Sequence, residues 1–132
     1  MSKIRVGIIG AGEAALFHAL AYSQISSKAQ LAAVCDINEF AAKGLAKTYN
    51  VERIFTDYKM MLQQKDIDAV SICLPHFLHA DVTEAAAKSG KHVLCEKPMA
   101  LTLKDCDRMI NASKKAGVKL MIAENHRWTP AH

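Results

Sequence analysis

The sequence has no C-x-x-C pair, no low-complexity tract and no apolar run near the roughly 20 residues that a membrane-spanning helix needs. Its four cysteines, at positions 35, 73, 95 and 106, are not spaced like a disulfide framework, and three of them fall within apolar strand patterns. We therefore expect reduced thiols in a cytoplasmic protein. The first residues enter an apolar strand pattern directly, so we expect no signal peptide.

Aromatic side chains are also scarce, at 6% of the chain, and they are not interleaved with an Arg-rich stripe. The 17 basic and 13 acidic residues give a formal charge of +4, and the lysines are dispersed along stretches that we expect to form solvated helix faces. This pattern argues against a nucleic-acid partner, and the lack of a spanning segment argues against a membrane partner. The histidines lack the spacing of a metal motif, so we expect no metal site.

Strand and helix patterns alternate along the whole chain. Of its 132 residues 51% are hydrophobic and 23% charged, which is typical of one soluble globular domain. We predict strands at 4–9, 31–35, 54–55, 69–74, 91–95 and 119–123, and helices at 13–24, 38–49, 58–63, 79–89 and 102–116. Continuous apolar strands joined by helices predict an α/β fold with a doubly wound parallel sheet in the order 3-2-1-4-5-6.

The packing of several side chains also follows from the pattern. In the first helix Leu16, Ala19 and Leu20 recur at helical spacing, so we expect them to form its buried face. Tyr22, Phe40 and Phe55 are interpreted as core or helix-packing residues, and His18 and His92 as packing or surface residues.

A glycine-rich turn follows the first strand. Gly10, Gly12 and Ala15 form a G-x-G-x-x-A pattern that opens a helix, the arrangement that brings a dinucleotide pyrophosphate against main-chain N–H groups. Glu13 and Ala14 complete the first turn and belong to the predicted cofactor site. Two glycines at such a turn also occur for structural reasons alone, so the motif needs support from elsewhere.

Asp36 supplies that support. It lies 21 positions after Ala15, at the end of the second predicted strand, where a carboxylate can accept hydrogen bonds from the adenosine ribose, and Ile37 follows it. A carboxylate there repels a 2′-phosphate, so we expect NAD, with NADP less favoured. The alternatives are that Asp36 caps the next helix, for which Asn38 is the better residue, or that the ligand is another nucleotide such as coenzyme A.

Lys97 lies at the carboxyl end of the fifth predicted strand, between Glu96 and Pro98. Ligands of doubly wound sheets bind at this edge, and a lysine there can exchange the hydroxyl proton that accompanies hydride transfer. Glu96 could orient a ribose hydroxyl. We expect Lys97 and the glycine turn to face one shared hollow. The Lys97–Pro98 bond is a plausible cis site, although cis is the minority state for a bond that precedes proline. The alternative is a surface Glu-Lys pair before a turn proline.

These motifs together resemble the Gfo/Idh/MocA family of NAD(P)-dependent oxidoreductases (glucose–fructose oxidoreductase, inositol 2-dehydrogenase, rhizopine catabolism). The resemblance spans nearly the whole chain and is carried by residues 7–12 with His18, 34–36, 74–79, 90–100 and 125–130. It implies that 1–123 is a Rossmann domain, and that 124–132 begins the connection to an absent C-terminal substrate domain. It also implies a homo-oligomer when full length.

The resemblance further implies roles for individual residues. Lys97 would be the catalytic lysine and Glu96 would lie beside the nicotinamide ribose. The remaining implied cofactor contacts come from the segment after the fourth strand and from the end of the chain: Leu74, Pro75, His76, His79, Asn125 and Arg127. The function expected is the cofactor-binding half of a dehydrogenase that acts on an alcohol or ketone of a sugar, cyclitol or related small polyol. The alternative is a non-catalytic dinucleotide sensor or regulatory module.

Overall fold

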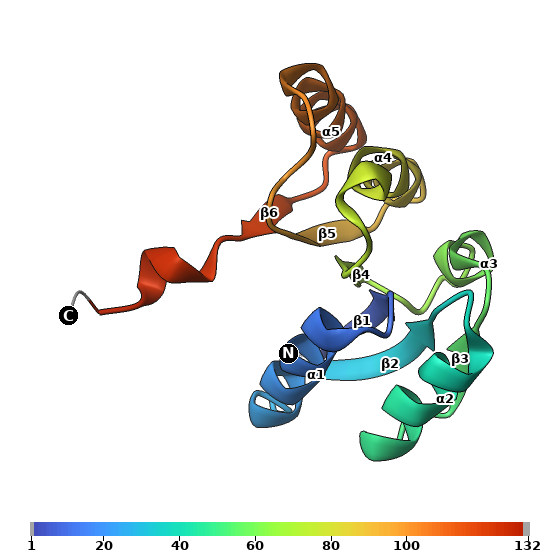
Figure 1. The fold of residues 1–132 in the computed structure, drawn as a ribbon. Coiled ribbons are helices and arrows are strands. Elements are labelled where there is room, and N and C mark those ends of the chain that lie inside the picture. The colour runs from blue at the N-terminus through green and yellow to red at the C-terminus, as the bar shows by residue number, and fades with distance from the viewer. Residues whose placement is uncertain (1, 131–132) are drawn as a thin grey trace.

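Residues 2–130 are described by the computed structural model, and they form a parallel sheet of six strands in the order β3-β2-β1-β4-β5-β6 (Figure 1). The predicted strand order is confirmed. The strands are β1 Ile4–Ile9, β2 Ala29–Cys35, β3 Arg53–Phe55, β4 Ala69–Ile72, β5 His92–Glu96 and β6 Leu120–Ala123. The helices are α1 Glu13–Gln24, α2 Glu39–Thr48, α3 Tyr58–Leu62, α4 His79–Lys88 and α5 Leu103–Ala116, with short 3-10 turns η1 His76–Leu78 and η2 Asn125–Trp128.

The helices cover the two faces of the sheet in separate groups (Figure 1). On one face α1 and α2 pack over β1 and β2, around the core residues Ile8, Ala15, Ala19, Val34, Ala42, Leu45, Ala46 and Val51. On the other face α3, α4 and α5 enclose a larger core that includes Ile9, Met61, Ile67, Val70, Ile72, Val82, Val93, Cys95 and Met109. Parallel strands with helices on both faces have all their carboxyl ends at one edge, which is where the candidate site lies.

The buried face of α1 differs from the predicted one. Ala19 is buried as predicted, together with Ala15 and His18, but Leu16 and Leu20 are about half exposed. Small side chains at 15 and 19 allow the helix to approach the sheet closely, so the leucine stripe turns away from it. Phe40 is also exposed rather than packed, while Tyr22 and Phe55 contact the two cores as predicted.

Local signals set the helix ends. The side chain of Asn38 accepts a hydrogen bond from the Ala41 N–H, so it caps its helix as predicted. Thr102 caps α5 in the same way, by accepting a hydrogen bond from the Asp105 N–H. Gly117 ends α5 in the left-handed conformation. The Lys97–Pro98 bond, a plausible cis site from the sequence, is cis.

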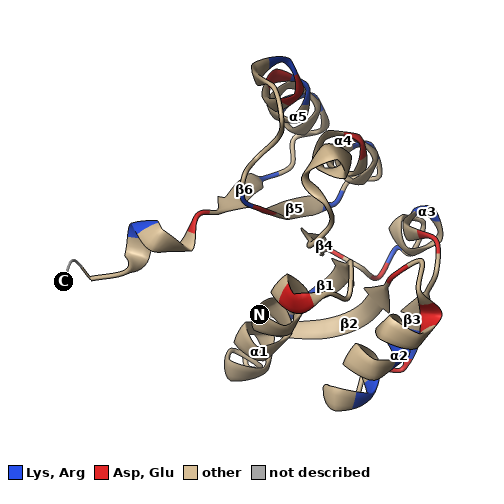
Figure 2. Ribbon diagram, viewed as in Figure 1, with Lys and Arg blue, Asp and Glu red and all other residues tan. Residues whose placement is uncertain are grey.

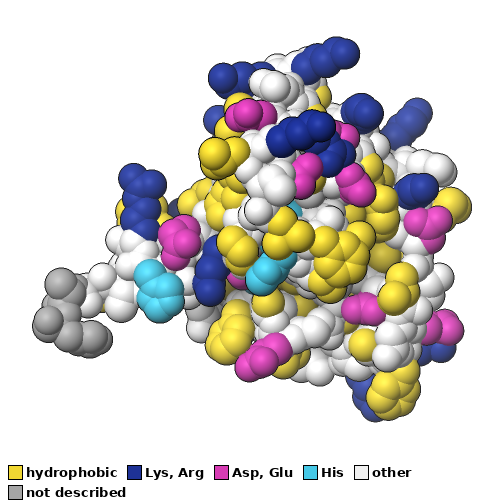
Figure 3. Space-filling model, turned by 45° about the horizontal axis from the view of Figure 1, so that its top comes forward, with side chains coloured by type: hydrophobic (Ala, Val, Ile, Leu, Met, Phe, Trp, Pro, Cys, Tyr) yellow, Lys and Arg dark blue, Asp and Glu magenta, His cyan; other side chains and the backbone are white. Residues whose placement is uncertain are grey.

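Charged residues of both signs are interspersed over the ribbon and over the molecular face seen in the space-filling view (Figures 2 and 3). Within the described range, no helix combines the length and the apolar character that crossing a bilayer requires. Beyond β6 the chain continues through η2, which projects away from the sheet (Figure 1). Residues 1, 131 and 132, at the ends of the two predicted segments, lie outside the described range.

Candidate dinucleotide site

The turn between β1 and α1 lies against the end of β4. Gly10 has a φ of 98°, and a Cβ built there would lie 2.2 Å from the main-chain oxygen of Cys73. Its N–H donates to the Cys35 oxygen at 2.7 Å, which ties the turn to the end of β2 as well. Only glycine fits both the conformation and the contact, so Gly10 holds the ends of three adjacent strands together.

Gly12 is different, because a Cβ there would meet no described heavy atom within 4 Å. Gly12 is the N-cap of α1, and in the described chain no side chain caps the helix start. The first N–H groups of α1, at Glu13, Ala14 and Ala15, thus lack the side-chain acceptor that an N-cap usually supplies. The space over Gly12 and these free donors fit an anionic group such as a pyrophosphate.

Asp36 joins this turn to the one after β2. Its Oδ2 accepts a hydrogen bond from the Ala11 N–H at 2.7 Å, and its Oδ1 accepts one from the Asn38 N–H at 2.8 Å. A carboxylate has about four acceptor positions, so these two bonds leave room for ribose hydroxyls. Asp36 therefore has a structural contact with the glycine turn that the sequence did not indicate, alongside its predicted role.

A pocket of about 760 Å³ opens beside the glycine turn. Six of the predicted cofactor residues line it: Gly10, Gly12, Asp36, Ile37, Leu74 and Pro75. Its remaining walls are mostly apolar, a character suited to an aromatic base held by a few polar groups. The structure thus brings together the glycine turn, the acidic residue after β2 and the segment after β4.

One wall of this pocket is formed by residues that were not predicted from the sequence. Thr56, Asp57, Tyr58 and Lys59 line it from the turn after β3, and Phe77 lines it from η1. The signal that could have found them is topological, because β3 also ends at the carboxyl edge of the sheet. Asp57 was not recognised as the N-cap of α3, where its side chain accepts the Lys59 N–H.

Two cysteines in the pocket wall are protected thiols. Burial raises the pKa of Cys35 to about 12, and the negative charge of Asp36 adds to the effect. Burial likewise raises the pKa of Cys73 to about 12, with Glu96 adding to it. Since the thiolate is the reactive form, neither side chain suits nucleophilic chemistry at neutral pH.

Lys97 is not among the residues that line this pocket. Its side chain is exposed, directly after the last residue of β5. Its N–H donates to Oε2 of Glu96 at 3.1 Å, while Oε1 of Glu96 lies 2.7 Å from Nε2 of His18 on α1. The loop of residues 97–102 between β5 and α5 (the lysine loop) is therefore connected at its start to α1, the helix whose N-cap is Gly12.

The two histidines after β4 lie differently. His76 is exposed on η1, whereas His79 is completely buried beneath the pocket and not part of its lining. Nε2 of His79 lies 2.9 Å from the Leu74 oxygen, and Nδ1 lies 3.0 Å from the Pro98 oxygen. His79 thus connects the segment after β4 to the loop that follows Lys97.

Asn125 and Arg127 are exposed on η2, and neither belongs to the pocket lining. The Arg127 guanidinium carbon lies 5.5 Å from the ring centre of Trp128, its neighbour on the same turn. The structure does not bring these two predicted residues to the glycine turn. Among residues 2–130, no group of three or more His, Cys, Asp or Glu side chains is arranged to hold a metal ion.

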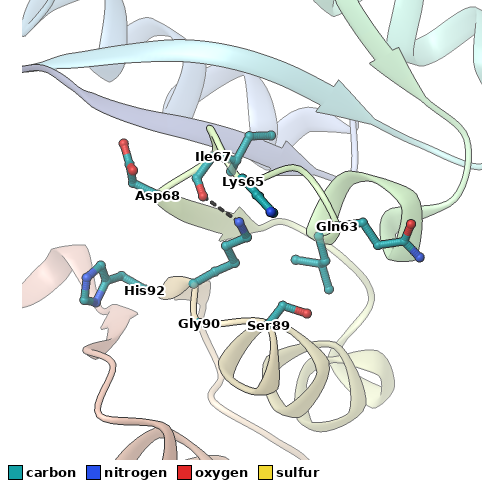
Figure 4. Close-up of a pocket in the computed structure, with 9 residues that line it drawn as sticks. Gln63, Lys65, Ile67, Asp68, Ser89, Gly90 and His92 are labelled. Atoms are coloured by element: carbon teal, nitrogen blue, oxygen red, sulfur yellow. Dashed lines mark hydrogen bonds between the residues drawn. The ribbon is translucent and has the colours of Figure 1, made fainter.

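A second hollow, of about 400 Å³, lies at the opposite edge of the sheet, where β4 and β5 begin (Figure 4). Lys91 is buried there, and its Nζ donates to the main-chain oxygens of Gln64 and Ile67, the latter at 2.7 Å. Burial lowers the pKa of Lys91. The Lys91 side chain is therefore not solvated, and its bonds to main-chain carbonyls give it a structural role.

Comparison with known proteins identifies the family of the chain. Residues 4–124 match the family described as "Oxidoreductase family, NAD-binding Rossmann fold". The chain belongs to the Gfo/Idh/MocA oxidoreductase family. It is 36% identical over 125 residues to myo-inositol 2-dehydrogenase of Thermotoga maritima, covering 95% of this chain and 37% of the relative. It is 34% identical over 131 residues to D-apiose dehydrogenase of Paraburkholderia graminis, covering 99% of this chain and 35% of the relative.

A solved structure gives the same result. The WlbA dehydrogenase of Bordetella pertussis, in complex with NADH and UDP-GlcNAcA, superposes with a TM-score of 0.90 at 35% identity, covering 96% of this chain and 38% of that one. The Gfo/Idh/MocA chain described here therefore spans between a third and two fifths of the length of these relatives. Family membership and the Rossmann fold are confirmed, and the predicted cofactor, NAD, agrees with the family's description. No comparison favours a non-catalytic module.

Proposed function

We propose that this domain binds NAD(H) at the carboxyl edge of its sheet and forms the cofactor-binding half of a dehydrogenase. The enzyme would interconvert an alcohol and a ketone on a sugar, cyclitol or related small polyol. The named relatives support this substrate class, since they include dehydrogenases of myo-inositol and D-apiose. The observation that carries the proposal is the open N-terminus of α1, with space over Gly12, beside a pocket that contains Asp36.

Each part of the edge has a role in holding the cofactor. The free N–H groups of the first turn of α1 would hold the pyrophosphate. Asp36 would accept hydrogen bonds from the adenosine ribose and disfavour a 2′-phosphate by charge repulsion. The apolar walls after β3 and β4 would exclude water around the base. When bound, the nicotinamide accepts or supplies the hydride.

Lys97 is the residue that we propose for proton exchange. Its ammonium can hold the proton that a carbonyl oxygen gains during reduction, and its amine can take the proton that a hydroxyl loses during oxidation. Its position after β5 and its exposed side chain make its Nζ accessible to a substrate. Glu96, held beside it, would contact the nicotinamide ribose.

Two further expectations belong to this proposal. Each of the four cysteines in the described chain is a free thiol, which supports a reducing compartment such as the cytoplasm. We also propose that 1–123 is the cofactor domain, that 124–132 starts the connection to a substrate domain, and that the complete protein is a homo-oligomer. The remaining cofactor contacts, from His76, Asn125 and Arg127, stay predictions.

Titration of this chain with NADH and with NADPH tests the proposal. We expect NADH to bind more tightly, and Asp36→Ala to narrow the ratio of the two dissociation constants. The ratio is the informative quantity, because Asp36 also supports the glycine turn. Loss of the Asp36 side chain should therefore weaken the binding of both cofactors. Failure of the wild-type chain to bind either cofactor would remove the proposed function.

Lys97→Ala tests the chemistry separately. We expect the Lys97→Ala chain to bind NADH as tightly as the wild-type chain does. In an active protein that contains this domain, we expect the same substitution to abolish turnover. Turnover at the wild-type rate would show that another group exchanges the proton.

A further inference from the structure

A line of four hydrogen-bonded side chains runs from α1 across β4 to the end of β5. The hydroxyl of Tyr22 lies 2.6 Å from Oγ of Ser71, and that Oγ lies 3.3 Å from Nδ1 of His18. Nε2 of His18 lies 2.7 Å from Oε1 of Glu96. Three elements that are distant in the sequence are therefore joined beneath the candidate site by polar contacts.

The chemistry of the groups gives this line a direction. A carboxylate only accepts, so Nε2 of His18 carries the hydrogen and donates it to Glu96. In the neutral ring Nδ1 is then an acceptor, which the Ser71 hydroxyl can satisfy. The Tyr22 hydroxyl in turn donates to Ser71. With this assignment every polar group in the line has a partner, and the histidine has one defined tautomer.

Burial raises the energetic cost of losing any of these hydrogen bonds. The His18 side chain is 8% exposed, and Ser71 is completely buried. Buried polar groups that lose a partner retain their desolvation cost, so the line strongly favours one arrangement of side chains. A histidine chosen only to fill space would not need both nitrogens to face polar partners.

The far end of the line reaches the lysine loop. Oε1 of Glu96 is held by His18, and Oε2 accepts the N–H of Lys97. We propose that His18 is a positioning residue, which fixes the Glu96 carboxylate and through it the main chain at Lys97. The claim that this affects cofactor binding depends on the proposed function. The claim about position does not, because it concerns the free protein.

The placement of His18 has a consequence for how the site works. It lies six positions after Gly12 on α1, the helix whose N-terminus would hold the pyrophosphate. One rigid helix would thus set the position of the phosphate site and also the position of the strand end that carries Glu96 and Lys97. A substitution at His18 should therefore change both the phosphate site and the main chain at Glu96 and Lys97.

Three variants and three measurements test this. His18→Leu removes both ring nitrogens, His18→Gln keeps an N–H donor, and Tyr22→Phe is the matched control that leaves the His18–Glu96 contact in place. The measurements on this chain are the tautomer of His18 from ring ¹⁵N shifts, hydrogen exchange of the Lys97 amide, and the dissociation constant of NADH.

We expect the Nε2–H tautomer at His18 in the wild-type chain. His18→Leu should speed exchange of the Lys97 amide and weaken NADH binding, each by about tenfold, the loss expected for a bond to a charged group. His18→Gln should recover most of both effects, and Tyr22→Phe should leave the Lys97 amide near its wild-type exchange rate. A purely structural role would not give rescue by His18→Gln at the Lys97 amide.

The outcomes that overturn the proposal are distinct from those that overturn the proposed function. An Nδ1–H tautomer, or an unchanged Lys97 amide in a folded His18→Leu variant, would remove the positioning role. If His18→Leu does not fold, the wild-type tautomer and the His18→Gln exchange rate decide the question. A wild-type chain that shows the expected tautomer but does not bind NADH would leave the positioning role in place and refute the cofactor site.

Discussion

The two glycines of the turn after β1 should respond to alanine in opposite ways. At Gly10 a Cβ would lie 2.2 Å from the Cys73 oxygen, in a backbone conformation with φ of 98°. At Gly12 it would meet no described heavy atom within 4 Å, and φ is −85°, which any residue adopts. One substitution therefore tests the packing of the turn, and the other tests what lies over it.

The expected magnitudes differ as well. For Gly10→Ala the backbone conformation costs roughly 1–3 kcal/mol, and forcing the methyl group against the main chain adds about 1–3 kcal/mol. The sum, about 2–6 kcal/mol, is a large share of the 5–15 kcal/mol that is typical of a domain. For Gly12→Ala a poorer N-cap and a less flexible unfolded chain oppose each other, so stability should change by no more than about 1 kcal/mol.

NADH binding should separate the two effects. In Gly12→Ala the methyl group occupies the space from which a phosphate would reach the helix N–H groups, so the dissociation constant should rise by at least about tenfold, or 1.4 kcal/mol. Gly44→Ala is the matched control, because a Cβ there also meets no described atom, and it lies inside α2 away from the pocket lining. It should leave NADH binding unchanged and raise stability by roughly 0.5–1 kcal/mol.

Urea unfolding followed by circular dichroism and titration with NADH fluorescence measure both quantities. If Gly12→Ala folds and binds NADH as tightly as the wild-type chain, no phosphate lies over Gly12, and the argument from the open helix start is wrong. If Gly10→Ala is as stable as the wild-type chain, the close approach to Cys73 does not constrain the turn.

Three further predictions concern buried polar groups. Burial raises the pKa of Cys35, Cys73 and Cys95 to about 12; their contribution to stability is therefore complete below about pH 9 and is lost as the pH rises toward 12. Between about pH 9 and 12 each thiol should make the unfolding free energy fall by up to about 1.4 kcal/mol per pH unit. Cys35→Ala should reduce this slope of unfolding free energy against pH by the same amount. An unchanged slope would show that the pKa of Cys35 is not raised. Lys91→Met should destabilise the chain by roughly 2–4 kcal/mol in urea unfolding, since two buried carbonyls lose their donor, and a loss below about 0.5 kcal/mol would mean that water replaces the ammonium. His79→Ala should speed amide exchange in residues 97–101 as well as lower stability, and a loss of stability without faster exchange there would show that this histidine does not hold the lysine loop.

The sheet and its order were predictable because the signals are local and agree with one another. The glycine turn, Pro75 and Gly117 mark ends of elements, and apolar runs joined by helical patterns leave few topologies for a parallel sheet. Asp36 could be placed at the pocket for the same reason, since it ends a recognisable strand. The predicted bounds of the strands and helices were thus correct to within two residues at each end, with the largest differences at the start of β2 and the end of β4.

What failed depends on contacts between distant parts of the chain. The buried face of α1 was predicted to include Leu16 and Leu20 beside Ala19, but close approach to the sheet selects Ala15 in their place. Hydrophobicity alone does not reveal that preference. The contact of His18 with Glu96 joins residues 78 positions apart, and no periodicity indicates it. The structural role of Lys91 could not be predicted, because its carbonyl partners come from a turn whose path the local sequence pattern does not reveal.

The spacing of the strands explains why Lys97 is separate from the pocket. Neighbouring strands lie about 4.8 Å apart, so the end of β5, two strands from β1, lies roughly 10 Å from the glycine turn along the sheet edge. The pocket is lined by the glycine turn and by the segments that follow β2, β3 and β4, and the residues after β5 are not among its lining. A ligand with a single base would fill the pocket and never approach the lysine. A ligand with two nucleosides on either side of a pyrophosphate would use the pocket, the open helix start and the strand end together, and that length is what the arrangement of this edge favours.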